Sequence, residues 1–198
     1  MVRLKLLLAS GNRHKARELE RALPGWSFEL LSGIAFPDET GATFAENARA
    51  KAALGRAHAP DAWVAGEDSG LEVEALGGGP GIRSARYAGD RASDPDNVAK
   101  LLAELDGIEA EGRRARYVCE LVCRTPDGGE VAARGELSGR IAREARGSGG
   151  FGYDHVFVPD GETRTVAELG DGWKARHSHR ARAARALAEG LGAPARAL

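Results

Sequence analysis

Strand-like and helix-like patterns of hydrophobic residues alternate along the first part of the chain. Residues 4–9 form a short, continuous apolar run, which is typical of a buried strand. In residues 16–23, alanine and leucine recur at helical spacing, and the pattern ends at a Pro-Gly pair. Residues 27–31 favour a second strand. This alternation predicts an α/β layer fold.

Two more helices and an interrupted strand follow. Residues 43–57 open with the capping box Thr-Phe-Ala-Glu and continue as an alanine-rich helix. Residues 94–107 begin with Asp-Pro, carry a stripe of valine and leucine, and end at a glycine. Between these helices, residues 62–66 predict a short strand, which the polar run 67–70 interrupts. Alternation resumes over residues 71–74.

The second half of the chain favours a hairpin. Residues 117–123 and 130–141 are strand-like and flank the turn signal Thr-Pro-Asp-Gly-Gly. Residues 154–159 predict another strand, and residues 179–191 predict a terminal helix. Since no linker, repeat or low-complexity segment separates these elements, we expect one domain over residues 1–198. Its α/β part and its hairpin part would form two lobes on one mixed β-sheet, with a cleft between them.

Composition and charge narrow the class of protein. Of the 198 residues, 42% are hydrophobic and 29% are charged, as in ordinary globular proteins. The net charge of −1 provides no global positive field that would favour nucleic acid. No run approaches the roughly 18 apolar residues of a membrane span, and the apolar start is too short for a signal peptide. We therefore expect a cytoplasmic protein that binds neither nucleic acid nor membranes.

The two cysteines, Cys119 and Cys123, lie in one predicted strand. They would share a face about 13 Å apart, at about 3.3 Å per residue. This separation is too large for a disulfide, and no second Cys/His pair has the spacing of a metal site. We expect both to be core residues in a reducing compartment.

The segment Ser10–Lys15 is a candidate phosphate-binding loop. A strand ends there, a glycine permits a tight turn, and a helix begins, so free amides and the helix dipole favour an anion. Lys15 adds a mobile positive charge. An ordinary strand-to-helix turn, with Asn12 as the N-cap and a solvated lysine, explains the same residues equally well.

The pair Glu67-Asp68 is a candidate site for metal binding or proton transfer. Adjacent carboxylates at a strand end are unfavourable unless they are solvated or neutralised by a cation. Mg²⁺ prefers such oxygens together with substrate phosphates, and a carboxylate can also deprotonate a water. Asn47 and Lys51, four residues apart on one helix face, could meet a phosphate or a metal-bound water. A surface turn beside a solvated helix face is the alternative.

Two further segments could recognise a nucleoside. The run 147–154 places two aromatic residues among glycines and ends at an aspartate, so a ring could stack on a base. Lys174 precedes Ser178-His179-Arg180 at a helix start, where amides and cationic side chains bind carbonyl or phosphate oxygens. The alternatives are a tight crossing in the core for the first segment and N-capping by Ser178 for the second.

The order of these segments carries more information than any one of them. The chain contains, in sequence, Ser-Gly-Asn-x-x-Lys, Glu-Thr-Gly-x-Thr-Phe-x-Glu-Asn-Ala-x-x-Lys-Ala, Glu-Asp-Ser-Gly-Leu, Gly-Gly-x-Pro-Gly-Ile-x-Ser-Ala-Arg-Tyr, Gly-x-Gly-Gly-Phe-Gly-Tyr-Asp and Ser-His-Arg. From about residue 6 to residue 182 it closely resembles the inosine triphosphate pyrophosphatase family, house-cleaning enzymes that hydrolyse deaminated purine nucleotides.

The resemblance implies an elongated α/β fold with a curved mixed sheet flanked by helices, an active-site cleft and a homodimer. It also implies Mg²⁺-dependent hydrolysis of ITP, dITP and XTP to the monophosphate and pyrophosphate. By position, Asp68 would be the catalytic base and a metal ligand, with Glu39 and Glu67 as further metal ligands. The implied substrate contacts are Ser10, Gly11, Asn12, Arg13, His14, Lys15, Lys51, Ser69, Phe151, Gly152, Tyr153, Asp154, Lys174, His179 and Arg180.

Four positions depart from the family pattern. Ser10 stands where threonine is usual, Glu67 replaces a common aspartate, and His155 and Trp173 are also atypical. Two other functions remain open: a pyrophosphatase for other modified nucleotides, of the kind typified by Maf-like proteins, and a nucleotide-binding regulator without catalysis. The intact Asp68 argues against the regulator.

Overall fold

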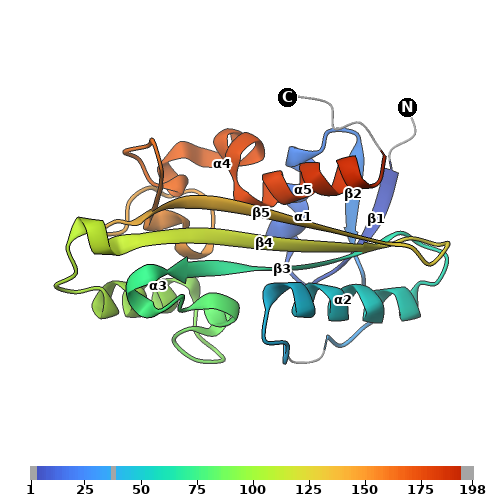
Figure 1. The fold of residues 1–198 in the computed structure, drawn as a ribbon, viewed down its shortest axis with the longest axis horizontal. Coiled ribbons are helices and arrows are strands. Elements are labelled where there is room, and N and C mark those ends of the chain that lie inside the picture. The colour runs from blue at the N-terminus through green and yellow to red at the C-terminus, as the bar shows by residue number, and fades with distance from the viewer. Residues whose placement is uncertain (1–3, 37–38, 193–198) are drawn as a thin grey trace. The chain divides into compact units, whose positions relative to one another are not determined.

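The computed structural model describes residues 4–36 and 39–192, and its central element is a six-stranded β-sheet with the order β2-β1-β3-β4-β5-β6 (Figure 1). The strands are β1 (Leu4–Ala9), β2 (Trp26–Leu30), β3 (Val64–Val73), β4 (Arg114–Arg124), β5 (Glu130–Ile141) and β6 (Phe157–Pro159). The α-helices are α1 (Arg13–Ala22), α2 (Phe44–His58), α3 (Asp94–Glu104), α4 (Val166–His177) and α5 (His179–Gly190). Short 3₁₀ helices include η2 (Gly81–Arg86) and η4 (Gly152–His155).

The sheet is mixed, as the sequence predicted. Strand β1 runs parallel to β2 and to β3, with Leu6 opposite Phe28 and Leu8 opposite Ala65. Strand β6 pairs with β5 in the antiparallel direction. The α/β prediction is therefore confirmed, with helices flanking an open mixed sheet.

The chain divides into two compact units. The first comprises residues 1–68, 119–135 and 175–198, and the second comprises residues 69–118 and 136–174. The unit boundaries fall inside strands β3, β4 and β5 and inside helix α4.

In the first unit, helices α1 and α5 contact each other and belong to the main core (Figure 1). Buried leucines and alanines from both helices pack with Leu6, Leu8 and Leu121 of the sheet. Helix α2 forms a separate small cluster, in which Ala48 and Ala52 contact Val122. This alanine-rich face lets the α2 backbone approach the sheet closely, which positions the polar side chains of α2.

Two strand glycines set the distance between helix and sheet in the first unit. A Cβ on Gly66 would overlap the backbone carbonyl oxygen of Ala48 in α2. A Cβ on Gly135 would overlap the carbonyl oxygen of His179 in α5. Since these neighbours are backbone atoms, neither helix could keep its place against a larger side chain. The glycines therefore fix the helices that carry several predicted site residues.

The second unit has its own apolar core. Leu71 and Val73 of β3 pack with Val98 and Leu101 of α3 and with Phe157 of β6. Helix α3 also contacts η2 and η4. The stripe of valine and leucine that predicted α3 is thus the face that it buries, and the structure adds a capping box formed by Ser93 and Asp96, which was not predicted from the sequence.

Two predictions about the elements were wrong, and one helix was missed. Strand β3 is continuous from Val64 to Val73, so residues 67–70 do not interrupt it. The predicted strand 154–159 is shortened to β6, because η4 occupies its first residues. Helix α4 was not predicted; a non-helical glycine, Gly170, lies inside it and disturbs its pattern.

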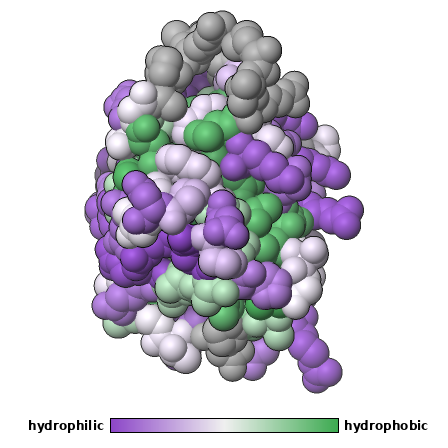
Figure 2. All heavy atoms as spheres, turned by 90° about the vertical axis from the view of Figure 1, so that its right-hand side faces the viewer, coloured by the Kyte–Doolittle hydropathy of each residue, from purple (hydrophilic) through white to green (hydrophobic). Residues whose placement is uncertain are grey.

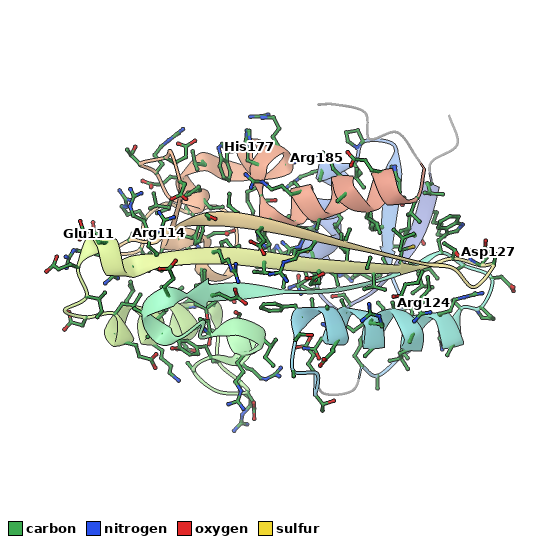
Figure 3. The ribbon with its side chains drawn as sticks, in the orientation of Figure 1. Glu111, Arg114, Arg124, Asp127, His177 and Arg185 are labelled. Atoms are coloured by element: carbon green, nitrogen blue, oxygen red, sulfur yellow. The ribbon has the colours of Figure 1, made fainter. Side chains whose placement is uncertain are left out.

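The predicted hairpin and the two cysteines agree with the structure. Asp127 lies at the tip of the β4–β5 turn, where Thr125 and Gly129 are joined by a backbone hydrogen bond (Figure 3). Cys119 and Cys123 are both free thiols in the core. Burial raises the pKa of Cys123 to about 12, so the thiol is inert at neutral pH.

The molecular surface is mainly polar on the face that Figure 2 presents, with hydrophobic residues in small areas between hydrophilic ones. Among the helices of residues 4–36 and 39–192, none combines the length and the apolar character that crossing a bilayer requires.

Candidate functional site

The dipeptide Glu67-Asp68 lies within β3, and both residues are buried. Successive side chains of a strand point to opposite faces of the sheet. Accordingly, Glu67 contacts side chains of α1 and α5, whereas Asp68 contacts side chains of α2. The two carboxylates therefore belong to two separate polar clusters of the first unit.

The Asp68 cluster is built on one face of α2. Asn47 Nδ2 donates to Asp68 Oδ2 at 3.0 Å, and Lys51 Nζ donates to Asp68 Oδ1 at 3.1 Å. Lys51 also donates to the Glu67 backbone carbonyl at 3.1 Å and forms an ion pair with Glu39. Because Asn47 and Lys51 are four residues apart, they occupy one helix face, as the sequence indicated.

Burial and charge shift the proton affinities in this cluster. The pKa of Asp68 is raised, first by burial and then by the nearby Glu39, and these effects exceed the opposing influence of Lys51. Burial disfavours the ammonium form of Lys51, but Asp68 and Glu39 overcome this effect and raise its pKa. Asp68 is thus a carboxylate that accepts a proton more readily than a solvated aspartate.

A pocket of about 420 Å³ opens beside this cluster. Its walls are formed by the segment before α2 and by the first turns of α2. The lining side chains that carry charge or amide groups are Glu39, Glu46, Asn47 and Lys51. A small polar ligand in this pocket would meet two of the groups that hold Asp68.

The Glu67 cluster is a row of alternating charges. Lys15 at the start of α1 forms an ion pair with Glu67 at 2.5 Å, and the Arg180 guanidinium binds the same carboxylate at 3.0 Å. Arg180 also forms an ion pair with Glu18 of α1. The Cys119 thiol donates to Glu67 Oε1 at 3.4 Å. All these charges except that of Lys15 are buried almost completely.

This pairing holds Glu67 in its ionised form. Burial alone would raise the pKa of Glu67, but Lys15 and Arg180 overcome that effect and hold the pKa well below its ordinary range. Burial alone would lower the pKa of Arg180, but the carboxylates of Glu67 and Glu18 overcome that effect and raise it. The cluster therefore fixes Lys15 and Arg180, from opposite ends of the chain, on one fully buried carboxylate.

The predicted phosphate loop is a capped helix start. Asn12 Oδ1 accepts hydrogen bonds from the amides of His14 at 2.9 Å and Lys15 at 3.4 Å. The Asn12 amide donates to Ser10 Oγ at 3.1 Å. Within the described part of the chain, the exposed amides of Gly11 and Arg13 have no acceptor. Both features that the sequence left open, the cap and free amides, are therefore present together.

In the second unit, Asp154 connects several predicted site residues. Lys174 Nζ lies 2.6 Å from Asp154 Oδ2 and 4.8 Å from the centre of the Phe151 ring. The Phe151 amide donates to the same oxygen at 3.1 Å. Tyr117 donates to the other oxygen, Oδ1, at 3.3 Å.

Further hydrogen bonds fix the loop that carries Phe151. The Gly152 amide donates to Asp94 Oδ2 at the start of α3, at 2.7 Å. The Tyr153 hydroxyl donates to the backbone carbonyl of Ser84 at 2.8 Å. Phe151, Gly152, Tyr153 and Asp154 are thus held by partners in four other segments of the same unit, which are η2, α3, β4 and α4. Ser69 is half-buried at the start of this unit.

The start of α5 is also rigidly placed. Ser178 is its N-cap and accepts from the Ala181 amide at 3.1 Å, as the sequence favoured. Arg185 donates to the carbonyls of Ala175 and Arg176 at the end of α4, close to His177 (Figure 3). His179 and Arg180, in the first turn of α5, are buried.

The structure brings together some of the predicted metal ligands and not others. Asp68 and Glu39 share Lys51, but the Glu67 carboxylate lies in the other cluster. Among residues 4–36 and 39–192, no group of three or more His, Cys, Asp or Glu side chains is arranged to hold a metal ion.

Sequence reasoning missed two residues of these clusters, Glu18 and Tyr117. Glu18 lies beside the apolar stripe of α1 and is buried, so a charged residue at the edge of that stripe was the available signal. Tyr117 lies at an inward position of β4, where an apolar residue would satisfy the pattern, so its hydroxyl contact with Asp154 had no signal in the sequence.

Comparisons with known proteins identify the family of the chain. The model of the Ham1 family matches residues 6–190. The chain is 46% identical over 194 residues to the dITP/XTP pyrophosphatase of Bdellovibrio bacteriovorus, covering 95% of this chain and 98% of the relative. It is 48% identical over 196 residues to the enzyme of that name from Methylococcus capsulatus, covering 96% and 97%.

A solved structure gives the same result. The Ham1 protein of Staphylococcus aureus superposes with a TM-score of 0.83 at 38% sequence identity, covering 95% of this chain and 98% of that chain. These matches extend along nearly the whole chain and confirm the resemblance drawn from the six ordered motifs. The chain belongs to the Ham1 family.

Proposed function

We propose that this protein hydrolyses deaminated purine nucleoside triphosphates (ITP, dITP and XTP) to the nucleoside monophosphate and pyrophosphate. Relatives that match almost the full length of the chain are named dITP/XTP pyrophosphatases. The observation that carries the proposal is the buried Asp68 carboxylate, held between Asn47 and Lys51 with a raised pKa. A carboxylate in this state is suited to accept a proton from an attacking water.

Asp68 is the proposed general base. Its Oδ2 is fixed by Asn47 and its Oδ1 by Lys51, so the carboxylate keeps one orientation. As Asp68 takes a proton from water, the resulting hydroxide attacks phosphorus and breaks the anhydride bond between the α and β phosphates. Pyrophosphate then leaves, and one water has been consumed for each triphosphate.

We infer that Mg²⁺ is the cofactor. Asp68 and Glu39 are two carboxylates whose mutual repulsion contributes to the raised pKa of Asp68, and a divalent cation would relieve this repulsion. Two carboxylates suit Mg²⁺, which completes its coordination with water and substrate phosphates. When bound, the ion would neutralise charge on the phosphates. Glu67, also expected among the metal ligands, would support the site by holding Lys15.

The first unit supplies the proposed phosphate contacts. Free amides at Gly11 and Arg13, together with the positive end of the α1 dipole, favour an anion. Lys15 adds a positive charge that Glu67 holds in place. The proposed contacts of the triphosphate are Ser10, Gly11, Asn12, Arg13, His14, Lys15 and Lys51, with Ser69 as a further substrate contact.

Purine selection is assigned to cationic donors and an aromatic ring. Hypoxanthine and xanthine carry a carbonyl at C6, where adenine carries an amine. Lys174 and Arg180 could donate to the carbonyl but would face the protons of the amine, and a buried donor left unpaired penalises the wrong base. The proposed nucleoside contacts are Phe151, Gly152, Tyr153, Asp154, Lys174, His179 and Arg180.

The setting would be the cytoplasmic nucleotide pool, and the protein would act as a homodimer.

A substrate panel tests the proposal. Pyrophosphate release with Mg²⁺ would be measured for ITP, dITP, XTP, ATP, GTP, dTTP and a modified pyrimidine triphosphate. The proposal requires the three deaminated purines to have the highest kcat/KM. A preference for the pyrimidines would identify a different nucleotide pyrophosphatase, and ITP binding without Mg²⁺-dependent release would identify a regulator.

A further inference from the structure

The Tyr117 hydroxyl makes a polar contact inside the apolar core of the second unit. Tyr117 is 7% exposed and lies in β4, where its ring packs against Phe157 with ring centres 4.5 Å apart. Its hydroxyl donates to Asp154 Oδ1 at 3.3 Å. A phenylalanine would fill the same space, so packing alone does not require the hydroxyl.

The acceptor, Asp154, is attached at both of its oxygens. Oδ2 receives the Lys174 ammonium at 2.6 Å and the Phe151 amide at 3.1 Å, while Oδ1 receives Tyr117. Asp154 and Lys174 are each 4% exposed, so little water competes for these contacts. Because both oxygens are anchored, the carboxylate cannot rotate freely about its Cβ–Cγ bond. Such a rotation would move Oδ2 away from the Lys174 ammonium.

The position of Lys174 depends on this carboxylate. The ammonium lies 4.8 Å from the centre of the Phe151 ring, an arrangement in which the cation is attracted to the ring face. A four-carbon side chain has many rotamers, so a fixed counter-ion is needed to hold its end in one place. Tyr117 therefore fixes the orientation of the Asp154 carboxylate, and this carboxylate in turn fixes the Lys174 ammonium.

We infer that Tyr117 is a positioning residue for purine selection: its hydroxyl fixes Asp154, which holds the Lys174 ammonium where it donates to the C6 carbonyl of the base. This inference rests on the proposed function, in which Lys174 is a base contact. It adds Tyr117 as the side chain that determines how well Lys174 discriminates between a carbonyl and an amine at C6. Loss of the hydroxyl leaves the ion pair in place but lets the ammonium take alternative positions.

The test compares Tyr117→Phe with Tyr87→Phe. The control also removes one tyrosine hydroxyl, but that hydroxyl contacts Glu104 rather than Asp154. For Tyr117→Phe, we expect KM for ITP to rise about three- to ten-fold, the size of one net hydrogen bond. We expect kcat within about two-fold of wild type, and the preference for ITP over ATP to fall by a similar factor. Tyr87→Phe should leave both values unchanged, and thermal melting should show both variants folded.

A double-mutant cycle separates positioning from packing. In an Asp154→Asn background, Tyr117→Phe should change the ITP preference no further, because the hydroxyl acts through that carboxylate. An unchanged KM and preference in Tyr117→Phe, or a full additional effect in the Asp154→Asn background, would overturn the inference. If wild-type protein has no preference for ITP over ATP, the proposed function fails instead, whatever the effect of Tyr117.

Discussion

Glu67 and Asp68 are neighbours in β3, yet their carboxylates bind cations from different helices. Glu67 forms an ion pair with Lys15 of α1, and Asp68 forms one with Lys51 of α2. Because strand residues alternate between faces, one dipeptide anchors two clusters on opposite sides of the sheet. Substitution of the two residues should therefore have different consequences, on turnover for Asp68 and on stability for Glu67.

Asp68→Asn should abolish hydrolysis while retaining ITP binding. The amide keeps the size of the side chain but cannot accept a proton from water, so kcat should fall by about 10²- to 10⁴-fold. Steady-state kinetics and calorimetric titration of ITP measure the two effects. Asp61→Asn, at an exposed position, is the matched control. Near-normal turnover of the Asp68 variant would show that another group is the base.

Lys15→Ala should weaken the binding of the triphosphate more than it slows turnover. Lys15 lies in the first turn of α1, where its charge adds to the helix dipole. We expect KM for ITP to rise by at least about ten-fold, the effect of losing one charge-assisted hydrogen bond. Lys5→Ala removes an exposed lysine that pairs with Glu29 and should leave KM unchanged. Equal KM values for the two variants would remove Lys15 from the phosphate contacts.

Glu67→Gln should destabilise the fold and flatten its pH dependence in acid. In the folded protein the pKa of Glu67 is lowered from its ordinary 4.5, so the ionised carboxylate stabilises the fold above about pH 4.5. This stabilisation is lost as the pH falls further towards the folded-state pKa. At neutral pH the substitution leaves Arg180 and Lys15 without their shared partner, which should cost about 3–5 kcal/mol.

Urea unfolding in the presence of a chelator measures this effect without bound metal. Between about pH 5 and about pH 3, the unfolding free energy of wild type should fall more steeply than that of Glu67→Gln. Glu29→Gln, which affects only an exposed pair with Lys5, should keep the wild-type slope. Parallel slopes for wild type and Glu67→Gln would mean that Glu67 is not held ionised by this cluster.

Arg113→Met should destabilise the fold. The Arg113 guanidinium is buried and donates to the backbone carbonyls of Leu105, Ile141 and Ala142 at 2.6 to 2.9 Å. Without it, each of these three carbonyls loses one donor, so we expect a loss of about 3 kcal/mol in unfolding free energy. Arg114→Met breaks only an exposed pair with Asp160 and should cost less than about 1 kcal/mol. Similar losses in both variants would contradict a stabilising role for the hydrogen bonds of Arg113.

Sequence patterns predicted elements well where one rule decides the structure. The bounds of β1 and β5 agree with the predicted strands 4–9 and 130–141, because a continuous apolar run and a regular alternation identify a buried and a half-buried strand. The break predicted in β3 was wrong because Lys15 and Arg180, remote in the sequence, neutralise Glu67 inside the strand. Local rules cannot include such partners.

In the candidate site, too, local patterns identified some residues, and contacts between distant parts of the chain determined others. Asn47 and Lys51 were grouped from their spacing on one helix, and the structure places both on Asp68. Glu18 and Tyr117 act through contacts with residues distant in the chain, Arg180 and Asp154, so no motif contains them. The order of six motifs identified the family, because ordered matches along a whole chain are far more specific than any single loop.

The products formed from ITP test the central claim most directly. Purified protein would be incubated with ITP and Mg²⁺, and the nucleotides and phosphates would be separated by anion-exchange chromatography, with Asp68→Asn as the inactive control. We predict IMP and pyrophosphate in equal amounts, with ATP turned over at least about 100-fold more slowly. Formation of IDP and phosphate, or equal turnover of ITP and ATP, would contradict the proposed function.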